Sequence, residues 1–421
     1  MKKINVLALV LALMLLLAGC AEKDPVVISV NGETLTLSAL TEQVDAQIAY
    51  NQQINNLTMS YYGVSAGYPT DRTEVATTLA NACVNTMVAL QKAKELGMDQ
   101  LTEEETAAVK EAAQVEFDRI IASVASSDYA DLPAEEATQK AIAFAKEKGV
   151  DVNSYIESET KTIMLDKLQA EMIKDVTVSD DEVQAAYDKR VEEDKAFFDL
   201  NPQVFGDYIN QDYARPYYAP EGYRYVKHIL VQFTENDLTA INQKRDALVL
   251  AAGKVGQAKN DANADVDAAQ QEMDAAQAAL DEAIAAAREN IQARVDEVMA
   301  LATAEGADFD ALVAQYNQDP GMPEAGYVIC EGYPSFVESF VNDGMALANI
   351  GDVSQPSYSD YGCHIIKYVG DLAGGAYEAE AGLAEMKAGM LSDAQDKVFE
   401  EKLNQWISEA DVKIELDKLT K

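Results

Sequence analysis

The stretch Glu221–Phe233, EGYRYVKHILVQF, carries His228, one of only two histidines in 421 residues. The other, His364, lies in a similar stretch, Tyr361–Val369, YGCHIIKYV. Both stretches are short apolar runs rich in Val, Ile and Tyr and bounded by turn-forming residues, a pattern that predicts β-strands. Both histidines are therefore expected to lie on strands.

The length and charge of the chain bound the class of protein. A chain of 421 residues is too long for one ordinary core, so two or three domains are expected. The hydrophobic fraction of 48% is typical of a globular protein, and the formal net charge is −39. Such a charge argues against binding to nucleic acid or anionic lipid, which require basic patches. It fits a solvated acidic surface, or a protein that meets basic, unfolded clients.

Residues 1–19 predict a cleaved signal peptide. Lys2 and Lys3 form a basic start, and an apolar run from Ile4 to Leu17 is too short for a comfortable membrane span. Small residues then lead to Cys20, and Leu-Ala-Gly-Cys resembles a bacterial lipobox. The resemblance implies a diacylglyceryl group on Cys20, because two acyl chains anchor a protein stably. The alternative is an ordinary signal peptide with a chance cysteine.

Residues 26–196, which follow a short tether at 20–25, predict a mostly helical domain. Val26–Leu35 reads as a β-hairpin with an Asn-Gly turn, and Thr102 with Glu105 forms a capping-box pattern that opens a helix. Residues 197–222 contain Tyr, Pro and Gly without a regular period, which predicts a linker. Its aromatic residues are expected to pack against a domain, with binding of client peptide as the alternative. Further helical segments are expected at 73–96, 134–148, 153–174 and from 178.

The two histidine stretches resemble a known domain. Residues 227–231, KHILV, and 362–367, GCHIIK, resemble the first and last strands of a parvulin-type peptidyl-prolyl isomerase domain. That family ends in Gly-x-His-Ile-Ile and places two histidines side by side in its sheet. The turns 306–309, GADF, and 351–356, GDVSQP, also match its pattern. The resemblance implies an antiparallel sheet flanked by helices over residues 223–371.

An insertion interrupts this domain at about residues 236–286. A parvulin domain goes almost directly from its first strand into one helix, whereas here two helical segments, 238–259 and 266–301, follow. The second segment carries an apolar stripe at heptad-like spacings, and it is rich in alanine. An antiparallel helical arm is expected. Client contact, dimerisation and simple decoration all remain open as its role.

The remainder of the chain resembles the SurA-like and PrsA-like chaperones in architecture. Their chaperone domain opens with a hairpin and a helix, as residues 26 onward do here. In PrsA-like proteins a tail such as 379–421, read as a helix and a short strand, returns to that domain. The fold class implied is α+β: a helical SurA/PrsA-like chaperone domain plus a parvulin-type domain that carries an inserted helical hairpin.

Candidate site residues follow from the same resemblance. His228 and His364 match the paired histidines, and Asp319 lies in a loop where many PrsA-like proteins carry Asp. Each has a structural alternative. The histidines could be core residues with all their hydrogen bonds made, and Asp319 could only cap the loop before Pro320. The cup for proline matches Val328, Phe336 and Phe340, and plain core is the alternative for Phe336 and Phe340. The resemblance also implies hydroxyls from Ser359 and Tyr361.

The chemistry of these residues requires no cofactor or metal. The barrier to rotation about a Xaa–Pro bond reflects the resonance of the planar amide. An enzyme that accelerates this rotation requires an apolar cup that binds the twisted amide best. Two of the three glycines in the family's Gly-Gly-x-Leu-Gly strand are lost at 325–329, so activity is expected to be reduced.

Cys330 and Cys363 are either a disulfide pair or isolated buried thiols. No Cys-x-x-Cys or His-x-x-x-His spacing supports a zinc site.

Together these patterns predict a lipid-anchored, extracytoplasmic foldase of the bacterial cell membrane. Its expected partners are unfolded exported polypeptides, bound at their Xaa–Pro segments, and the membrane, bound through the lipid on Cys20. No nucleic-acid partner is expected. Whether the protein forms a homodimer is left open by the sequence. One alternative is a holdase with a degenerate, non-catalytic parvulin domain. Another is a lipoprotein whose arm scaffolds other envelope proteins.

Overall fold

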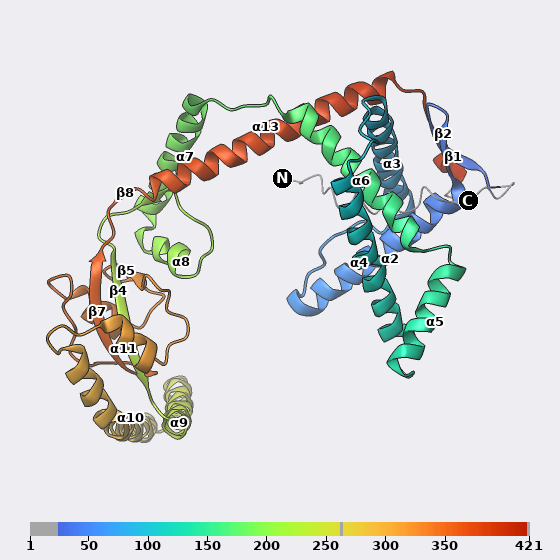
Figure 1. Cartoon of the computed structure of the whole chain (residues 1–421). Helices are drawn as coiled ribbons and strands as arrows, with labels where there is room; N and C mark the ends of the chain where they lie inside the picture. The colour runs from blue at the N-terminus through green and yellow to red at the C-terminus, as the bar shows by residue number, and fades with distance from the viewer. Residues whose placement is uncertain (1–23, 262–263, 419–421) are drawn as a thin grey trace. The chain divides into compact units, whose positions relative to one another are not determined.

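The computed structural model describes residues 24–261 and 264–418. The chain forms two compact units (Figure 1). The first, here called the helical unit, contains the residues up to Val178 together with those from Gly389 onward. The second, the sheet unit, runs from Ser179 to Ala388. The predicted signal peptide and Cys20 lie outside the described residues. No helix in the described part of the chain is long and apolar enough to cross a membrane.

A small sheet in the helical unit joins the two ends of the described chain. Strand β1 (Val26–Val30) pairs antiparallel with β2 (Glu33–Thr36) on one side and with β9 (Val412–Ile414) on the other. The turn between β1 and β2 has positive φ at Asn31 and Gly32, which suits an Asn-Gly hairpin turn.

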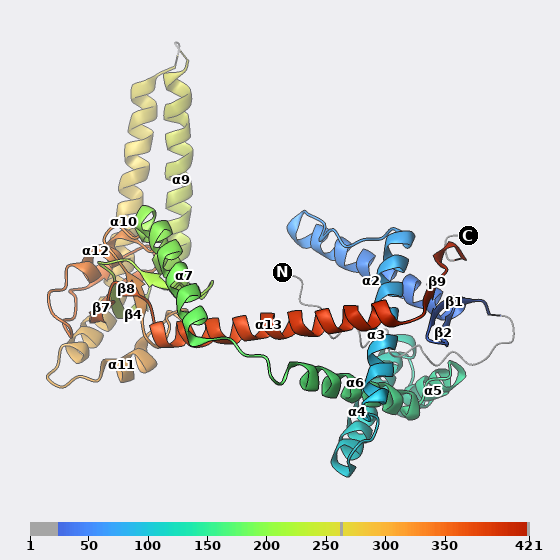
Figure 2. The same cartoon turned by 90° about the horizontal axis from the view of Figure 1, so that it is seen from above.

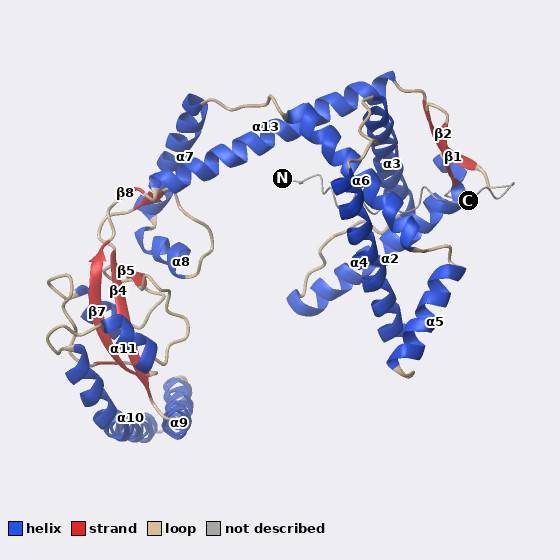
Figure 3. Cartoon of the chain, viewed as in Figure 1, coloured by secondary structure: helices blue, strands red, loops and turns tan. Residues whose placement is uncertain are grey.

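Helices form the rest of this unit (Figure 3). Asp71 caps α3 by accepting a hydrogen bond from the Glu74 N–H, and the predicted capping box of Thr102 and Glu105 opens α4. The apolar residues of α3 and β1 share one core with Trp406 of α13 (Ala379–Glu409). The helices are α2 (Leu37–Tyr62), α3 (Arg72–Glu95), α4 (Glu103–Asp128), α5 (Ala134–Glu147) and α6 (Val152–Ile173).

The sheet unit is built on four antiparallel strands in the order β5-β4-β7-β6. The central strands β4 (Arg224–Gln232) and β7 (Gly362–Asp371) pair over their whole length. Strand side chains alternate between faces, so Ile229 and Ile365 pack on one face in a core with α10 and α11 (Phe309–Tyr316). The other face carries the histidines. The edge strands are β5 (Tyr327–Ile329) and β6 (Ser357–Tyr358), and α12 (Glu338–Met345) covers the histidine face.

The predicted helical arm is confirmed. Helices α9 (Glu235–Lys259) and α10 (Val266–Ala302) lie side by side along their length (Figure 2). Leu280, Ala287 and Ile291 of the predicted stripe are buried on α10. Small alanine side chains at the contact allow the two helices to approach closely.

Residues 197–222 are not a free linker: their aromatic residues pack against the sheet unit, one of the two alternatives that the sequence left open. Phe198 and Phe205 are buried in one core with Tyr223, and their rings pack edge to face 5.4 Å apart. Tyr223 also donates a hydrogen bond to the carbonyl of Pro202. These aromatic residues anchor the segment to the sheet unit, which begins at Ser179, before the predicted domain start at residue 223. The segment contains the end of α7 (Asp180–Leu200), a 3-10 turn (Pro202–Val204), α8 (Phe205–Asn210) and β3 (Tyr218–Ala219), which pairs with β8 (Gly375–Ala376).

The cysteines of the sheet unit are unpaired. Cys330 packs in the core that contains Phe205 and Tyr223, whereas Cys363 packs in the core beneath the arm. Both are free and buried, so of the two alternatives the isolated thiols hold. Burial raises the pKa of the Cys363 thiol to about 12, which leaves it protonated and unreactive at neutral pH.

Candidate active site

The two histidines meet on the sheet, although 136 positions separate them in the chain. His228 of β4 lies opposite Ile366, and His364 of β7 lies opposite Leu230, so both side chains lie on the same face. Their Nδ1 atoms are 3.0 Å apart, and the rings stack with an interplanar angle of 15°. Their exposed fractions are 2% and 5%. The pair is therefore a buried, directly hydrogen-bonded unit.

Polar groups hold both ends of the pair. The outer nitrogen of His228, Nε2, lies 2.9 Å from Oδ2 of Asp319. The same carboxylate oxygen accepts a hydrogen bond of 2.9 Å from the hydroxyl of Tyr327. At the opposite end, Nε2 of His364 lies 2.7 Å from Oγ of Ser359. These five side chains form a continuous chain of contacts, here called the histidine network.

A loop after α11 presents Asp319 to His228. Asn317 fixes this loop, because its Oδ1 accepts hydrogen bonds from the N–H groups of Leu230 on β4 and of Asp319 itself. The hydrogen bond from His228 lowers the pKa of Asp319 to about 2, against the effect of burial, and the Gly321 N–H helps. Asp319 is therefore a carboxylate near neutral pH.

The carboxylate fixes the direction of the network when both imidazoles are neutral. A carboxylate only accepts hydrogen bonds, so His228 donates through Nε2–H and accepts at Nδ1. His364 then donates through Nδ1–H, which leaves its Nε2 to accept from the Ser359 hydroxyl. Burial, with the charge of His228 as a second cause, lowers the pKa of His364 to about 3, so this ring stays neutral.

Beside the network lies a cavity of about 350 Å³ with an aromatic wall. Phe340 packs edge-on against both imidazoles, with ring centroids 5.1 Å from His228 and 5.3 Å from His364. Phe336 packs between Phe340 and Tyr327, 5.7 Å and 4.6 Å away. The cavity is lined by His228, Leu230, Gln232, Asp319, Pro320, Tyr327, Ser335, Phe336, Val337, Phe340, Tyr361 and His364.

Most of the predicted site residues come together here. The three predicted catalytic residues, together with Phe336, Phe340 and Tyr361, line the cavity. Ser359 lies behind His364 and contacts its outer nitrogen.

The prediction that Val328 lines the cavity is wrong. Val328 is fully buried in the core beneath, and its N–H and carbonyl both bond the side-chain amide of Asn210. Side chains of a strand alternate between faces, so the neighbouring Tyr327 faces the cavity instead.

Tyr327 is the main site residue that the motif comparison missed. It contributes a ring to the cavity wall and a hydroxyl to Asp319, and burial together with that hydrogen bond raises its pKa. It occupies the variable position of the Gly-Gly-x-Leu-Gly strand, where the motif carries no signal. The alternation of side chains along β5 was the available clue.

The glycine that remains in that strand has a steric reason. Gly326 has φ +91°, and a Cβ there would lie 2.4 Å from the carbonyl oxygen of Val226. Only glycine permits this approach of β5 to β4.

The histidine half of the sheet unit matches a family model. Residues 276–370 match the PPIC-type PPIase (rotamase) domain. The match begins inside α10 and leaves out β4 with His228, which the arm separates from the rest of the domain in sequence. The pairing of β4 with β7 restores His228 to the site.

Curated relatives with sequence similarity are foldases. The chain is 39% identical over 62 residues to foldase protein PrsA 4 of Bacillus cereus. The matched stretch covers 15% of this chain and 22% of the relative. The chain is 30% identical over 118 residues to foldase protein PrsA of Clostridium tetani, covering 28% and 34%. The chain thus matches about a fifth to a third of the length of these relatives.

Solved structures of PrsA overlap a larger share of the chain at low similarity. PrsA from Bacillus subtilis covers 82% of this chain and 88% of its own, with 14% identity and a TM-score of 0.21. The sequence matches confirm the predicted resemblance: residues 276–370 match the PPIC-type PPIase domain, and part of the chain is similar in sequence to PrsA foldases.

Proposed function

We propose that the sheet unit catalyses cis/trans isomerisation of Xaa–Pro bonds in unfolded polypeptides. The observation that carries this proposal is the directly bonded pair of buried histidines, His228 and His364, beside an apolar cavity of about 350 Å³. The aromatic wall receives the proline ring. The match of residues 276–370 to the PPIC-type PPIase domain supports the assignment.

The cavity and the histidine network suit rotation about an Xaa–Pro amide. The barrier to rotation about an X–Pro amide comes from resonance that the twisted amide lacks, so an enzyme accelerates rotation by binding the twisted form best. The apolar wall excludes water from the amide, and the network holds its polar groups in fixed positions. His364 stays neutral and, when His228 is neutral too, donates its only N–H to His228. We therefore assign the histidine pair a positioning and electrostatic role, with no covalent step.

An isomerisation assay on proline-containing peptides tests the proposal. Replacing both His228 and His364 by Ala in the full-length chain is expected to lower kcat/KM by about 100-fold, because the preorganised polar groups beside the amide are lost. Far-UV circular dichroism checks that the variant is folded. Catalysis that survives the double substitution in a folded chain would show that the site is assigned wrongly.

A non-catalytic holdase is the second candidate function. Its supporting observation is the loss of two glycines from the strand at residues 325–329, next to the cavity. Binding of a proline peptide to the full-length chain, measured by calorimetry with no acceleration of isomerisation, is the result that favours it.

The helical unit supports a holding function for unfolded chains. Between Asp45 and Asp71 there is no charged residue, although 25% of the whole chain is charged. The loop that follows α2 is held against the helix, since Asn55 bonds both the N–H and the carbonyl of Tyr68. Tyr, Asn and Met side chains adapt to varied polypeptide partners. The exposed apolar side chains of this region are Tyr50, Leu57, Met59, Tyr61, Tyr62, Val64 and Tyr68.

Suppression of the aggregation of a chemically unfolded test protein measures this holding function. Replacing Tyr61 and Tyr62 by Ser is expected to weaken suppression, because two exposed aromatic contacts are lost. Tyr213→Ser in the sheet unit is the matched control, as Tyr213 is also exposed. Equal suppression by both variants contradicts a holding role for this region.

We further propose that the protein acts at the outer face of the bacterial cell membrane on exported polypeptides. The lipobox-like Leu-Ala-Gly-Cys at residues 17–20 supports a lipid anchor on Cys20. Metabolic labelling with a fatty acid is expected to mark the wild-type chain and not Cys20→Ser. Labelling of both chains, or of neither, contradicts the anchor.

A further inference from the structure

The turn that carries Ser359 is held by the inserted arm. This turn, residues 359–361 between β6 and β7, is called the Ser359 turn below. Within it, the Ser359 hydroxyl contacts His364, and its oxygen accepts a hydrogen bond from the Tyr361 N–H. Backbone hydrogen bonds from Ser359 to Gly362 and from Phe233 to Tyr361 hold the main chain. The turn therefore joins the end of the network to the Tyr361 side of the cavity.

Both residues that flank Ser359 contact the arm. On one side, the guanidinium of Arg288 on α10 lies 4.6 Å from the ring centroid of Tyr358, whose hydroxyl donates a hydrogen bond of 3.1 Å to Gln292. On the other side, Arg245 on α9 forms an ion pair of 2.9 Å with Asp360. Helix α10 thus contacts the residue before Ser359, and helix α9 contacts the residue after it.

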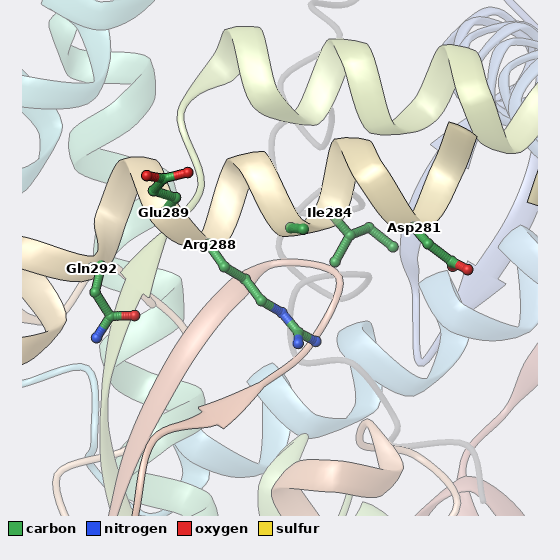
Figure 4. Close-up of a pocket in the computed structure, with 6 residues that line it drawn as sticks. Asp281, Ile284, Arg288, Glu289 and Gln292 are labelled. Carbon is green, nitrogen blue, oxygen red and sulfur yellow. The ribbon is translucent and has the colours of Figure 1, made fainter. Parts of the chain in front are cut away.

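Figure 4 shows Arg288 reaching from α10 across the turn beneath it, within a hollow that side chains of α10 line. Arginine and an aromatic face attract each other through the charge and the ring quadrupole. The contact crosses from the base of α10 to the last residue of β6, so the arm is physically connected to the cavity even though it lies outside it.

We propose that Arg245, Arg288 and Gln292 at the base of the arm are positioning residues that set the Ser359 turn, and through it the hydrogen bond from Ser359 to His364. The inference rests on the proposed isomerase function for its effect on rate. The effect on the histidine network itself does not depend on that function. The arm is then a working part of the site.

Two measurements test the proposal on the full-length chain. Because the chain has only two histidines, selective ¹⁵N labelling of histidine resolves each imidazole nitrogen by NMR. The double variant Arg245→Gln with Arg288→Gln is expected to shift the His364 Nε2 resonance toward its position in Ser359→Ala. It is also expected to lower kcat about 3–10-fold with KM changed less than twofold, since positioning rather than binding is lost.

Lys254→Gln supplies the matched control. Lys254 also joins the two arm helices, through an ion pair with Glu272, but it has no contact with the Ser359 turn. It removes a positive charge from the arm as each arginine substitution does. We expect wild-type imidazole resonances and wild-type kcat. The variant Arg245→Gln with Arg288→Lys keeps a positive charge at position 288. It is expected to recover part of the wild-type kcat and part of the wild-type His364 resonance.

The outcomes separate the two proposals. Wild-type His364 resonances in the folded double variant overturn the positioning role, whatever the rate. Shifted resonances in a chain whose wild type shows no isomerase activity support the positioning role and overturn the proposed function. An equal shift in Lys254→Gln also overturns the positioning role, because it shows a general effect of charge or of arm stability.

Discussion

At the scale of single residues, the site holds two ionisable groups whose pKa values are both lowered, which favours the charged carboxylate of Asp319 and the neutral imidazole of His364. Asp319 is held as a carboxylate by His228, Gly321 and Tyr327, whereas His364 is held neutral by its buried position. When His228 is neutral as well, these two states make the hydrogen bonds of the network directional. A directional network keeps the cavity floor in one arrangement.

The pKa of His364 predicts how stability depends on pH. Its pKa is about 3 in the folded chain, against an ordinary value of 6.5, so the unfolded state takes up a proton first as pH falls. Stability is therefore lost as pH drops from about 6.5 toward 3, with a slope of up to about 1.4 kcal/mol per pH unit. Urea unfolding of the sheet unit at pH 6 and pH 4.5 measures it. His364→Gln is expected to show a smaller slope, and parallel slopes contradict the prediction.

Tyr327→Phe tests the residue that the sequence motif missed. The substitution keeps the aromatic wall but removes the hydroxyl that donates to Asp319. We expect the pKa of Asp319 to rise toward its usual value, and kcat/KM to fall about 2–10-fold through loss of one charge-assisted hydrogen bond. Carboxyl NMR and the peptide assay measure these quantities. An unchanged Asp319 pKa contradicts the role given to the hydroxyl.

At the scale of elements, the central strand pair β4–β7 positions the site. The register places Leu230 opposite His364 and His228 opposite Ile366, so a shift by one residue would put a histidine on the opposite face. Gly362 begins β7 with φ +147°, and a Cβ there would lie 2.1 Å from the carbonyl oxygen of Val231. Close backbone approach at this point starts the pairing.

Gly362→Ala is therefore expected to destabilise the sheet unit by about 2–4 kcal/mol, since the strand must move away from β4. Gly370→Ala, in the same strand, is the matched control, because nothing lies within 4 Å of an added Cβ there. Urea unfolding compares the two variants. Similar midpoints would contradict the steric argument.

At the scale of the whole molecule, the two units have separate cores and share one long helix. The sheet unit ends at Ala388, inside α13, and the residues after it belong to the helical unit. Trp406, the only tryptophan in the chain, packs in the core of the helical unit with Val412 of β9. Its fluorescence therefore reports on that unit alone.

Removing residues 411–421 is expected to destabilise the helical unit and leave the sheet unit unchanged. The deletion takes away β9, which pairs with β1, and two apolar contacts to the core, Val412 and Leu416. We expect a loss of about 1–3 kcal/mol in the unfolding transition followed by Trp406 fluorescence. The urea dependence of the isomerase assay follows the sheet unit as the internal control. Equal destabilisation of both transitions contradicts independent cores.

Much of the site could be predicted from the chain alone. The two histidines, the Gly-x-His-Ile-Ile strand and the loop with Asp319 are local patterns, and they identify one side of the cavity. Val328 was misplaced and Tyr327 missed, because a motif names positions without showing which face of a short edge strand they occupy. Residues 197–222 looked like a linker because aromatic packing across the chain has no local period.

The amino-acid sequence by itself determined the strands, the helical arm and the kind of domain, since each depends on side-chain periodicity or on a short motif. Only the tertiary structure decided that Asp319 and Ser359 hold opposite ends of one histidine pair, and that the arm holds the Ser359 turn. The His228–Asp319 and His228–His364 contacts join residues 91 and 136 positions apart, and the contact of Arg245 with Asp360 joins α9 to the turn before β7. Strand register and packing create such neighbours, and no local stretch of sequence encodes them.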